Sequence, residues 1–362
     1  MAAAAIVAVT FGFNNSCLAG KKEAGQVFLA EDYFDLVPIA QPEGSFAVLG
    51  YAQGVSREGK VAGICWDTSF ERKLFLTDEF SGETVSFPPE VNPQSNAVFL
   101  TASGFIVGQS DYRDQSWVFY PSLGKAVVVP KLDGISASLH QALDDGERVF
   151  ILAFFDQEMA IFSVSPNGEV KEFPLSPNNG NYYAYGGMAW DSSEKKIWFY
   201  NQIGTVSGET KVRFGKLSLK KGEVKDVAYV LSGEHWIDDI SSKGELTGKK
   251  YSWDTAGKGL FFWKFGKKIE YVSSLEDDGF LVSNTQKFFS KKEIFGLAFN
   301  FTNYSGKADL FFLNSKGEYD IFLFDVFPKS LGAVQEDGEK IFLYVRETAN
   351  GTPMPRFLKP KN

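Results

Sequence analysis

Two residue types on which catalysis and metal binding often depend are scarce in this sequence of 362 residues. It holds two cysteines, Cys17 and Cys65, and two histidines, His140 and His235. No CxxC pair and no Cys/His cluster occurs, which excludes a disulfide framework and a structural zinc site. Nucleophile elbows, P-loops, Rossmann fingerprints and HExxH are also missing. We therefore expect no cofactor and no metal, and no linear motif names an activity.

Basic residues are fewer than acidic residues in this sequence. The chain has 37 Lys and Arg against 45 Asp and Glu, a formal net charge of −8, and its basic residues do not cluster except in the short tail 356–362. Neutralising a phosphate backbone takes a dense Lys/Arg surface. Nucleic acid is thereby excluded as a partner.

Long apolar runs are absent after residue 25, so we expect no transmembrane span. Before it, Ala2 to Phe13 form an apolar run of 12 residues, too short to cross a bilayer as a helix, followed by small residues up to Gly20. This order is typical of an export signal, although the usual positive start is missing. Cleavage after Ala19, a lipoprotein signal ending at Cys17 and an Ala-rich cytosolic start remain open. We predict a leader over 1–25 and an exported protein, periplasmic, surface-bound or extracellular.

What the sequence has in quantity is Phe and Gly, 35 of each, and 15% aromatic residues overall. Aromatic and β-branched side chains suit pleated, half-buried surfaces, and Gly suits turns. The composition predicts an all-β protein.

Paired apolar runs around short polar turns recur along the chain, a hairpin signal. One kind of hairpin lies at 141–155, 188–200 (MAWDSSEKKIWFY), 251–265 and 332–345, and more loosely at 51–67 and 97–111. A second kind lies at 74–88, 117–130, 160–174, 212–228, 260–272 and 310–324, and its turn glycines recur 42 to 54 residues apart. Two hairpins in each period make a four-stranded meander.

A small isolated sheet is marginal, whereas sheets stacked around an axis cover one another. The period of roughly 40–50 residues predicts one β-propeller domain over 26–362, with six to seven four-stranded blades, seven preferred. A pair of sandwiches or a β-helix does not explain that period. We expect 188–200 to be the two middle strands of a blade. The last unit lacks a clear first strand, which 26–39 could supply, so pairing of N- and C-terminal strands would close the ring.

Two early units carry a further pattern: AQGVSREGKVAG (52–63) leads to KLFLTD, and LTASGFIVGQS (100–110) leads to SWVFYP. Both resemble the extracellular HAF-type repeats of bacteria, over about a quarter of the chain. The resemblance implies an exported, propeller-like protein and names no activity.

Candidate ligand-binding residues lie where connections between blades meet near the channel. His140 precedes Asp144–Asp145, and His235 precedes the pair Asp238 and Asp239. A catalytic His needs an orienting carboxylate or a nucleophile, and closeness in the sequence does not establish one, so the ordinary loop reading is favoured for both histidines. Acidic pairs, including Asp277–Asp278, are typical of turns.

The loop 176–187 presents Tyr182, Tyr183 and Tyr185, and Trp236 follows His235. Such rings are favoured in recognition surfaces, although they could equally be buried strand residues. We predict that these aromatic, His and Asp residues line a ligand site, and we assign no catalytic residue.

The function favoured by these observations is a monomeric, non-catalytic binding module that holds a protein or glycan partner at its loop-rich face. Two alternatives stay open. One is a carbohydrate-active hydrolase or lyase with its site at the channel mouth; the other is a structural component of an envelope assembly, lipid-anchored at Cys17 or not.

Overall fold

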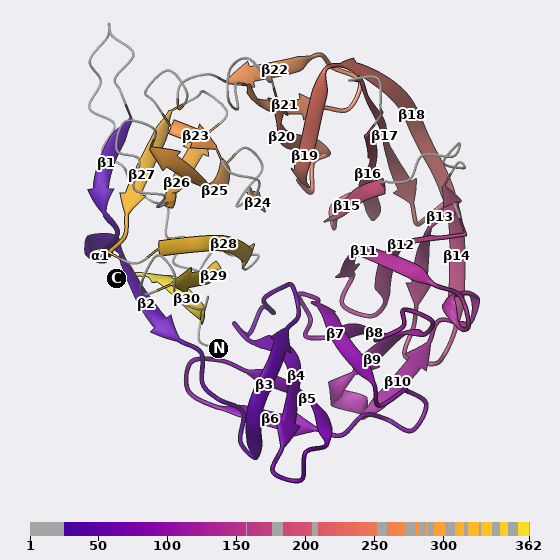
Figure 1. The fold of residues 1–362 in the computed structure, drawn as a ribbon. Coiled ribbons are helices and arrows are strands. Elements are labelled where there is room, and N and C mark those ends of the chain that lie inside the picture. The colour runs from indigo at the N-terminus through magenta and orange to yellow at the C-terminus, as the bar shows by residue number, and fades with distance from the viewer. Residues whose placement is uncertain are drawn as a thin grey trace, which may run out of the picture.

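The computed structural model of the chain is a closed ring of seven antiparallel sheets, which confirms the predicted β-propeller and its preferred number of blades (Figure 1). The structure describes residues 25–156, 158–175, 184–204, 209–251, 259–272, 275, 280–282, 287–288, 293–300, 308–314, 318–325, 327–334, 341–346 and 354–361. The predicted leader with Cys17, the tyrosines Tyr182 and Tyr183, and the pair Asp277–Asp278 lie outside these residues.

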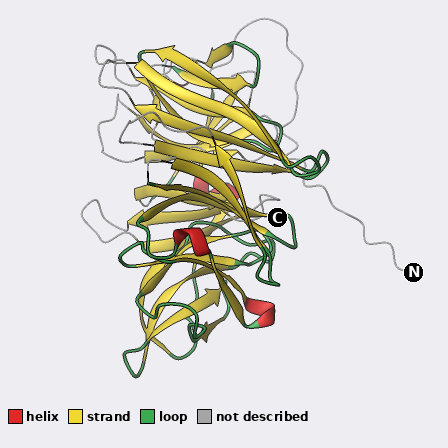
Figure 2. Ribbon diagram, turned by 90° about the vertical axis from the view of Figure 1, so that its right-hand side faces the viewer, coloured by secondary structure: helices red, strands yellow, loops and turns green. Residues whose placement is uncertain are grey.

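Each blade is a meander that runs from the channel outward, and seen from the side its strands cross the thickness of the ring (Figure 2). The innermost strands are β3 (Ser45–Tyr51), β7 (Ser95–Leu100), β11 (Ala137–Asp144), β15 (Ala184–Asp191), β19 (Glu234–Ile240), the pair β23 (Phe280–Val282) and β24 (Lys287–Phe288), and β28 (Phe327–Val334). The second strands are β4 (Val61–Asp67), β8 (Ile106–Ser110), β12 (Val149–Phe155), β16 (Lys196–Gly204), β20 (Glu245–Tyr251), β25 (Glu293–Asn300) and β29 (Ile341–Arg346).

The outer half of each blade follows the same order. The third strands are β5 (Arg72–Thr77), β9 (Ser116–Tyr120), β13 (Glu158–Val164), β17 (Glu209–Ser218), β21 (Leu260–Lys264), β26 (Ala308–Asn314) and β30 (Met354–Pro360). The fourth strands are β6 (Gly82–Val85), β10 (Lys125–Val128), β14 (Val170–Leu175), β18 (Glu223–Ser232), β22 (Ile269–Val272), β27 (Tyr319–Leu323) and β2 (Phe34–Pro38). Short helical turns lie at α1 (Ala30–Tyr33), η1 (Pro121–Leu123) and η2 (Pro130–Leu132).

The ring is closed by pairing of the two terminal regions, as predicted, but not in the predicted position. β2 pairs with β30 as the outermost strand of the seventh blade, and β28 supplies the innermost strand that the sequence seemed to lack. Just before β2, β1 (Gln26–Leu29) adds in parallel to β27 of the sixth blade. One N-terminal segment therefore joins the last two blades.

The stretch 188–200 falls on β15 and β16, which are the first and second strands of the fourth blade. The prediction that it forms the two middle strands is wrong. The hairpins placed at 74–88, 117–130 and 160–174 do form the third and fourth strands of their blades. Of their terminal prolines, Pro174 lies in the outermost strand β14, where a missing N–H donor is tolerated.

The hydrophobic core lies between blades rather than inside any one of them. Seven buried clusters are found among the described residues, and each joins two neighbouring blades. In the cluster between the fourth and fifth blades, for example, Phe214 packs against Trp263 at a ring-centroid distance of 5.7 Å. Each sheet therefore packs against a neighbouring blade on both of its faces. No helix in the described part of the chain is long and apolar enough to span a membrane.

Candidate functional site

The antiparallel order of each blade gives the ring two different faces. The innermost strands begin at one face, which also carries the turns between second and third strands, such as 68–71 and 111–115; we call it the front face. The turns between first and second strands and between third and fourth strands lie at the opposite, back face. The predicted ligand-binding residues that the structure describes lie on the innermost strands β11, β15 and β19, so they belong to the channel wall or to its front mouth.

His140 is the extra residue of a β-bulge in β11, between Leu139 and Gln141. A bulge leaves one residue out of the pairing and redirects its side chain. Among the described residues the buried Nε2 of His140 has no hydrogen-bond partner. Burial lowers the pKa of His140 to about 4, so the ring is neutral at physiological pH. The next residue, Gln141, accepts a hydrogen bond from the amide of Met188 and so links the third and fourth blades.

His235 lies at the start of β19 and is 2% exposed. Its Nδ1 is 3.2 Å from the carbonyl of Gly233, which can only accept, and its Nε2 is 3.0 Å from the hydroxyl of Tyr271. The neutral ring with its proton on Nδ1 satisfies both contacts. Burial lowers the pKa of His235, and the charge of Lys250 acts in the same direction. The main chain of His235 also bonds to Thr210, so this residue joins the fourth and fifth blades.

Tyr185 and Trp236 do come together, at the front mouth of the channel. Tyr185 comes from the start of β15 and Trp236 from the start of β19, and their ring centroids are 5.1 Å apart. The indole N–H of Trp236 donates to Glu234 Oε1 at 3.2 Å, which fixes the indole plane. Tyr185 is 47% exposed. Two neighbouring blades thus present one pair of rings to solvent.

The two aspartates are strand residues and not turn residues. Asp238 is the bulged residue of β19, and Asp239 Oδ2 accepts a hydrogen bond of 2.8 Å from the amide of Phe288 in β24. Burial lowers the pKa of Lys249 to about 8, and the nearby charge of Asp238 opposes that shift. Through its hydrogen bond to Phe288, Asp239 links the fifth and sixth blades. The pair Asp144–Asp145 does lie at a turn, where each carboxylate accepts backbone amides.

Apart from Tyr185, the exposed aromatic side chains of the front face were not predicted as site residues. Of the eight exposed aromatic side chains in the described ranges, six lie on this face. They are Phe46, Trp66, Phe70, Tyr112, Tyr185 and Tyr271. The sequence did hint at two of them. Phe70 and Tyr112 each lie in a short turn among polar residues, and a side chain in such a turn is far from the hydrophobic core.

The turn that carries Phe70 holds this side chain in an exposed position. Phe70 is 69% exposed, has φ of +60°, and packs with its ring tilted against that of Phe46 at a centroid distance of 5.4 Å. The left-handed region is unfavourable for a bulky residue. The turn persists because Asp67 Oδ1 accepts the amides of Ser69 and Glu71. Backbone strain at an exposed ring is a feature that often marks a functional surface.

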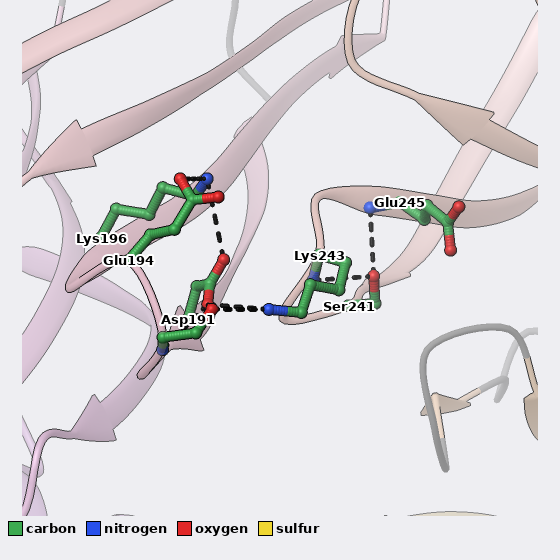
Figure 3. A network of polar contacts seen from close by, with 7 residues as sticks. Asp191, Glu194, Lys196, Ser241, Lys243 and Glu245 are labelled. Atoms are coloured by element: carbon green, nitrogen blue, oxygen red, sulfur yellow. Dashed lines mark hydrogen bonds and ion pairs between the residues drawn. The ribbon is translucent and has the colours of Figure 1, made fainter.

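A polar network on the back face holds two neighbouring blades together. Figure 3 shows Asp191 between the ammonium groups of Lys196 and Lys243, at 3.7 and 3.0 Å. Asp191 comes from the fourth blade and Lys243 from the fifth. Ser193 adds a hydroxyl that donates to Asp191 and accepts from Lys243. The aspartate is 2% exposed, so this network is structural. No group of three potential metal ligands occurs among the described residues.

No family model matches the sequence, and no curated protein matches it. The resemblance to HAF-type repeats thus gains no support beyond the residues quoted above. Solved structures do match. A post-proline cleaving enzyme from Rickettsia typhi has a TM-score of 0.51 and 8% identity, over 88% of this chain and 53% of that chain. This chain therefore spans about half the length of that enzyme.

Two other matches extend over the whole of the matched chain. YCF48 from Cyanidioschyzon merolae has a TM-score of 0.55 and 11% identity, over 90% of this chain and 98% of that one. A structure of YCF48 bound to D1 peptide has a TM-score of 0.55 and 10% identity, over 95% and 100%. At such identities the likeness concerns the fold, and it makes this chain a β-propeller module.

Proposed function

We propose that the chain is a non-catalytic binding module that holds a segment of a partner protein against its front face. The observation that carries the proposal is the gathering of exposed aromatic side chains on that face. Large rings with a polar tip supply contact area at low entropic cost, and they dominate binding energy at protein interfaces. The peptide-bound YCF48 propeller is a protein of similar fold with a peptide ligand, which supports the choice of a polypeptide over a glycan.

The placement of the two histidines also favours binding over catalysis. His140 lies on the third blade and His235 on the fifth, with the fourth blade between them. The nitrogens of His235 are engaged by Gly233 and Tyr271, and His140 is held neutral by burial. An acid–base pair would need one of these groups beside a nucleophile or an orienting carboxylate.

The experiment is site-specific photo-crosslinking. A benzophenone side chain replaces Tyr112 or Tyr185 on the front face, or Phe80 on the back face as a matched control, since Phe80 is 82% exposed. In an extract of the source cells, we expect both front-face positions to capture the same polypeptide and the control to capture none of it. With the purified partner, Tyr112→Ser should weaken binding by about tenfold or more, and Phe80→Ser should not. Equal capture from both faces would overturn the proposal, as would shortening of a polysaccharide by the purified chain.

We also propose that the chain is exported, because the apolar run over 2–13 followed by small residues is typical of an export signal. The test is expression of the full chain followed by cell fractionation and mass spectrometry of the N-terminus. Loss of about 19 residues would indicate simple cleavage, and a lipid-modified Cys17 would indicate an anchor. An intact chain in the cytosol would refute export.

A further inference from the structure

The corner where the ring closes contains a cavity that the proposed function does not use. The cavity has a volume of about 260 Å³ and lies between β1, α1 and β2 on one side and the ends of β27 and β30 on the other. Its apolar wall includes Leu29, Phe34, Leu323 and Leu358. Pockets for drug-sized ligands measure roughly 300–1,000 Å³, so this one suits a single side chain.

The charges around the cavity are unbalanced. Three carboxylates line it, those of Glu31, Asp35 and Asp325, together with one ammonium group, that of Lys361. Lys361 is already engaged, because its Nζ donates to the carbonyl of Glu31 at 2.6 Å and lies 3.6 Å from Asp35 Oδ1. An aliphatic chain that ends in a cation is complementary to both parts of this cavity, since its stem covers the apolar wall and its charge meets the carboxylates.

The strand beside the cavity offers a place for the main chain of the same ligand. β1 pairs with β27 through one edge only, and no described strand covers its other edge. Val27 and Leu29, on one face of β1, are 53% and 51% exposed. Leu29 also lines the cavity. An edge strand with exposed apolar side chains is a template for strand addition.

We propose that this corner binds an extended basic segment of a partner protein, which adds as a strand to β1 and inserts a Lys or Arg side chain into the cavity. Main-chain hydrogen bonds to β1 hold the segment, and Asp325 attracts the cation. The net charge of −8 favours a basic partner at long range. None of the exposed aromatic side chains of the front face lines this cavity, so the two proposals stand or fall independently.

The test uses two pentapeptide amides, VKVKV-NH2 and VQVQV-NH2, each labelled with fluorescein at its N-terminus and titrated with the full chain at low salt. We expect the lysine peptide to bind at least fivefold more tightly than the glutamine peptide, with the difference falling as salt screens the charges. Asp325→Lys should weaken binding of the lysine peptide by about fivefold to tenfold and leave the glutamine peptide nearly unchanged. The matched control is Glu223→Lys, the same charge change on the exposed edge strand β18 of the fourth blade.

A second readout follows the strand itself. Hydrogen exchange of the amides in 26–29 should slow when the lysine peptide binds, and exchange in β18 should not change. Circular dichroism of each variant shows that the fold is kept. The proposal is overturned if neither peptide binds at millimolar concentration, if Glu223→Lys weakens binding as much as Asp325→Lys does, or if 26–29 gains no protection.

Discussion

The buried aspartate of the back face offers the sharpest test of how the blades are held together. Asp191→Asn keeps the shape of the side chain but removes the charge that faces Lys196 and Lys243 (Figure 3). Lys196 is 8% exposed and also pairs with Glu194, so the substitution removes one of the two carboxylates that face this buried ammonium group. The side chain of Lys243 is 33% exposed, and water replaces part of its loss.

The expected loss of stability lies between two limits. Breaking a fully buried pair destabilises by about 3–5 kcal/mol, and an exposed pair is worth about 0–1 kcal/mol. With one buried lysine and one that is about one-third exposed, Asp191→Asn should lower the free energy of unfolding by about 2 kcal/mol. Urea unfolding followed by tryptophan fluorescence measures the change, since Trp198 lies 4.6 Å from Lys196 Nζ.

The control is Asp111→Asn. Asp111 pairs with Arg72 between the first and second blades, and both side chains of that pair are about one-third exposed. The control should cost less than about 1 kcal/mol. If Asp191→Asn is no more costly than the control, the buried network does not hold the blades and the reasoning fails.

The same network has a pH dependence. Burial alone would raise the pKa of Asp191, but hydrogen bonds from Ser193 and Lys243 and the charges of both lysines outweigh it and hold the pKa below its usual range. A carboxylate with a lowered folded pKa contributes stability above its unfolded pKa, roughly 3.9, and loses it as pH falls through the folded value. The difference between the native chain and Asp191→Asn should therefore stay constant from pH 7 to 5 and shrink below pH 4. A difference that grows on acidification would contradict the assigned ionisation.

Three further substitutions test other parts of the structure. Gln202→Leu should lower the free energy of unfolding by about 2–3 kcal/mol in urea, because the amide of Ile237 and a neighbouring carbonyl lose their buried partner. Phe70→Asn should raise it by about 0.5–1 kcal/mol, since Asn tolerates positive φ better, and a fall would argue against strain at this turn. Gly108→Ala should destabilise by about 1–3 kcal/mol, because a Cβ would stand 2.0 Å from the indole of Trp117; an unchanged thermal midpoint would refute that close approach.

The propeller was predictable because the outer hairpins carry strong local signals. Strands such as β12 and β13 are continuous apolar runs around a short turn, and their spacing repeats. The innermost strands are harder to predict from the sequence, because they face the channel and contain polar residues and bulges. β28, with the sequence FPKSLGAV, has two register shifts and reads poorly as a strand, so its role was assigned to 26–39 instead.

A residue of the candidate site could be placed from the sequence only where its position depends on the strand that contains it. Tyr185 and Trp236 reach the front mouth because each lies within the first three residues of an innermost strand. The burial of His235 could not be foreseen, since the groups that bond to its main chain, Gln202 and Thr210, come from another blade. Phe70 and Tyr112 are single rings in separate turns, and only the ring geometry places both on one face.

The closure of the ring has a consequence for synthesis on the ribosome. β2 emerges among the first residues of the described chain, and its partner β30 among the last. Until then the first-made strand has no sheet to join, and the seventh blade cannot be completed. Tying residues this far apart carries a large loop-closure cost. The ring should thus close only after β30 has left the ribosome, and until then β2 keeps an unpaired strand edge, which is a site for aggregation.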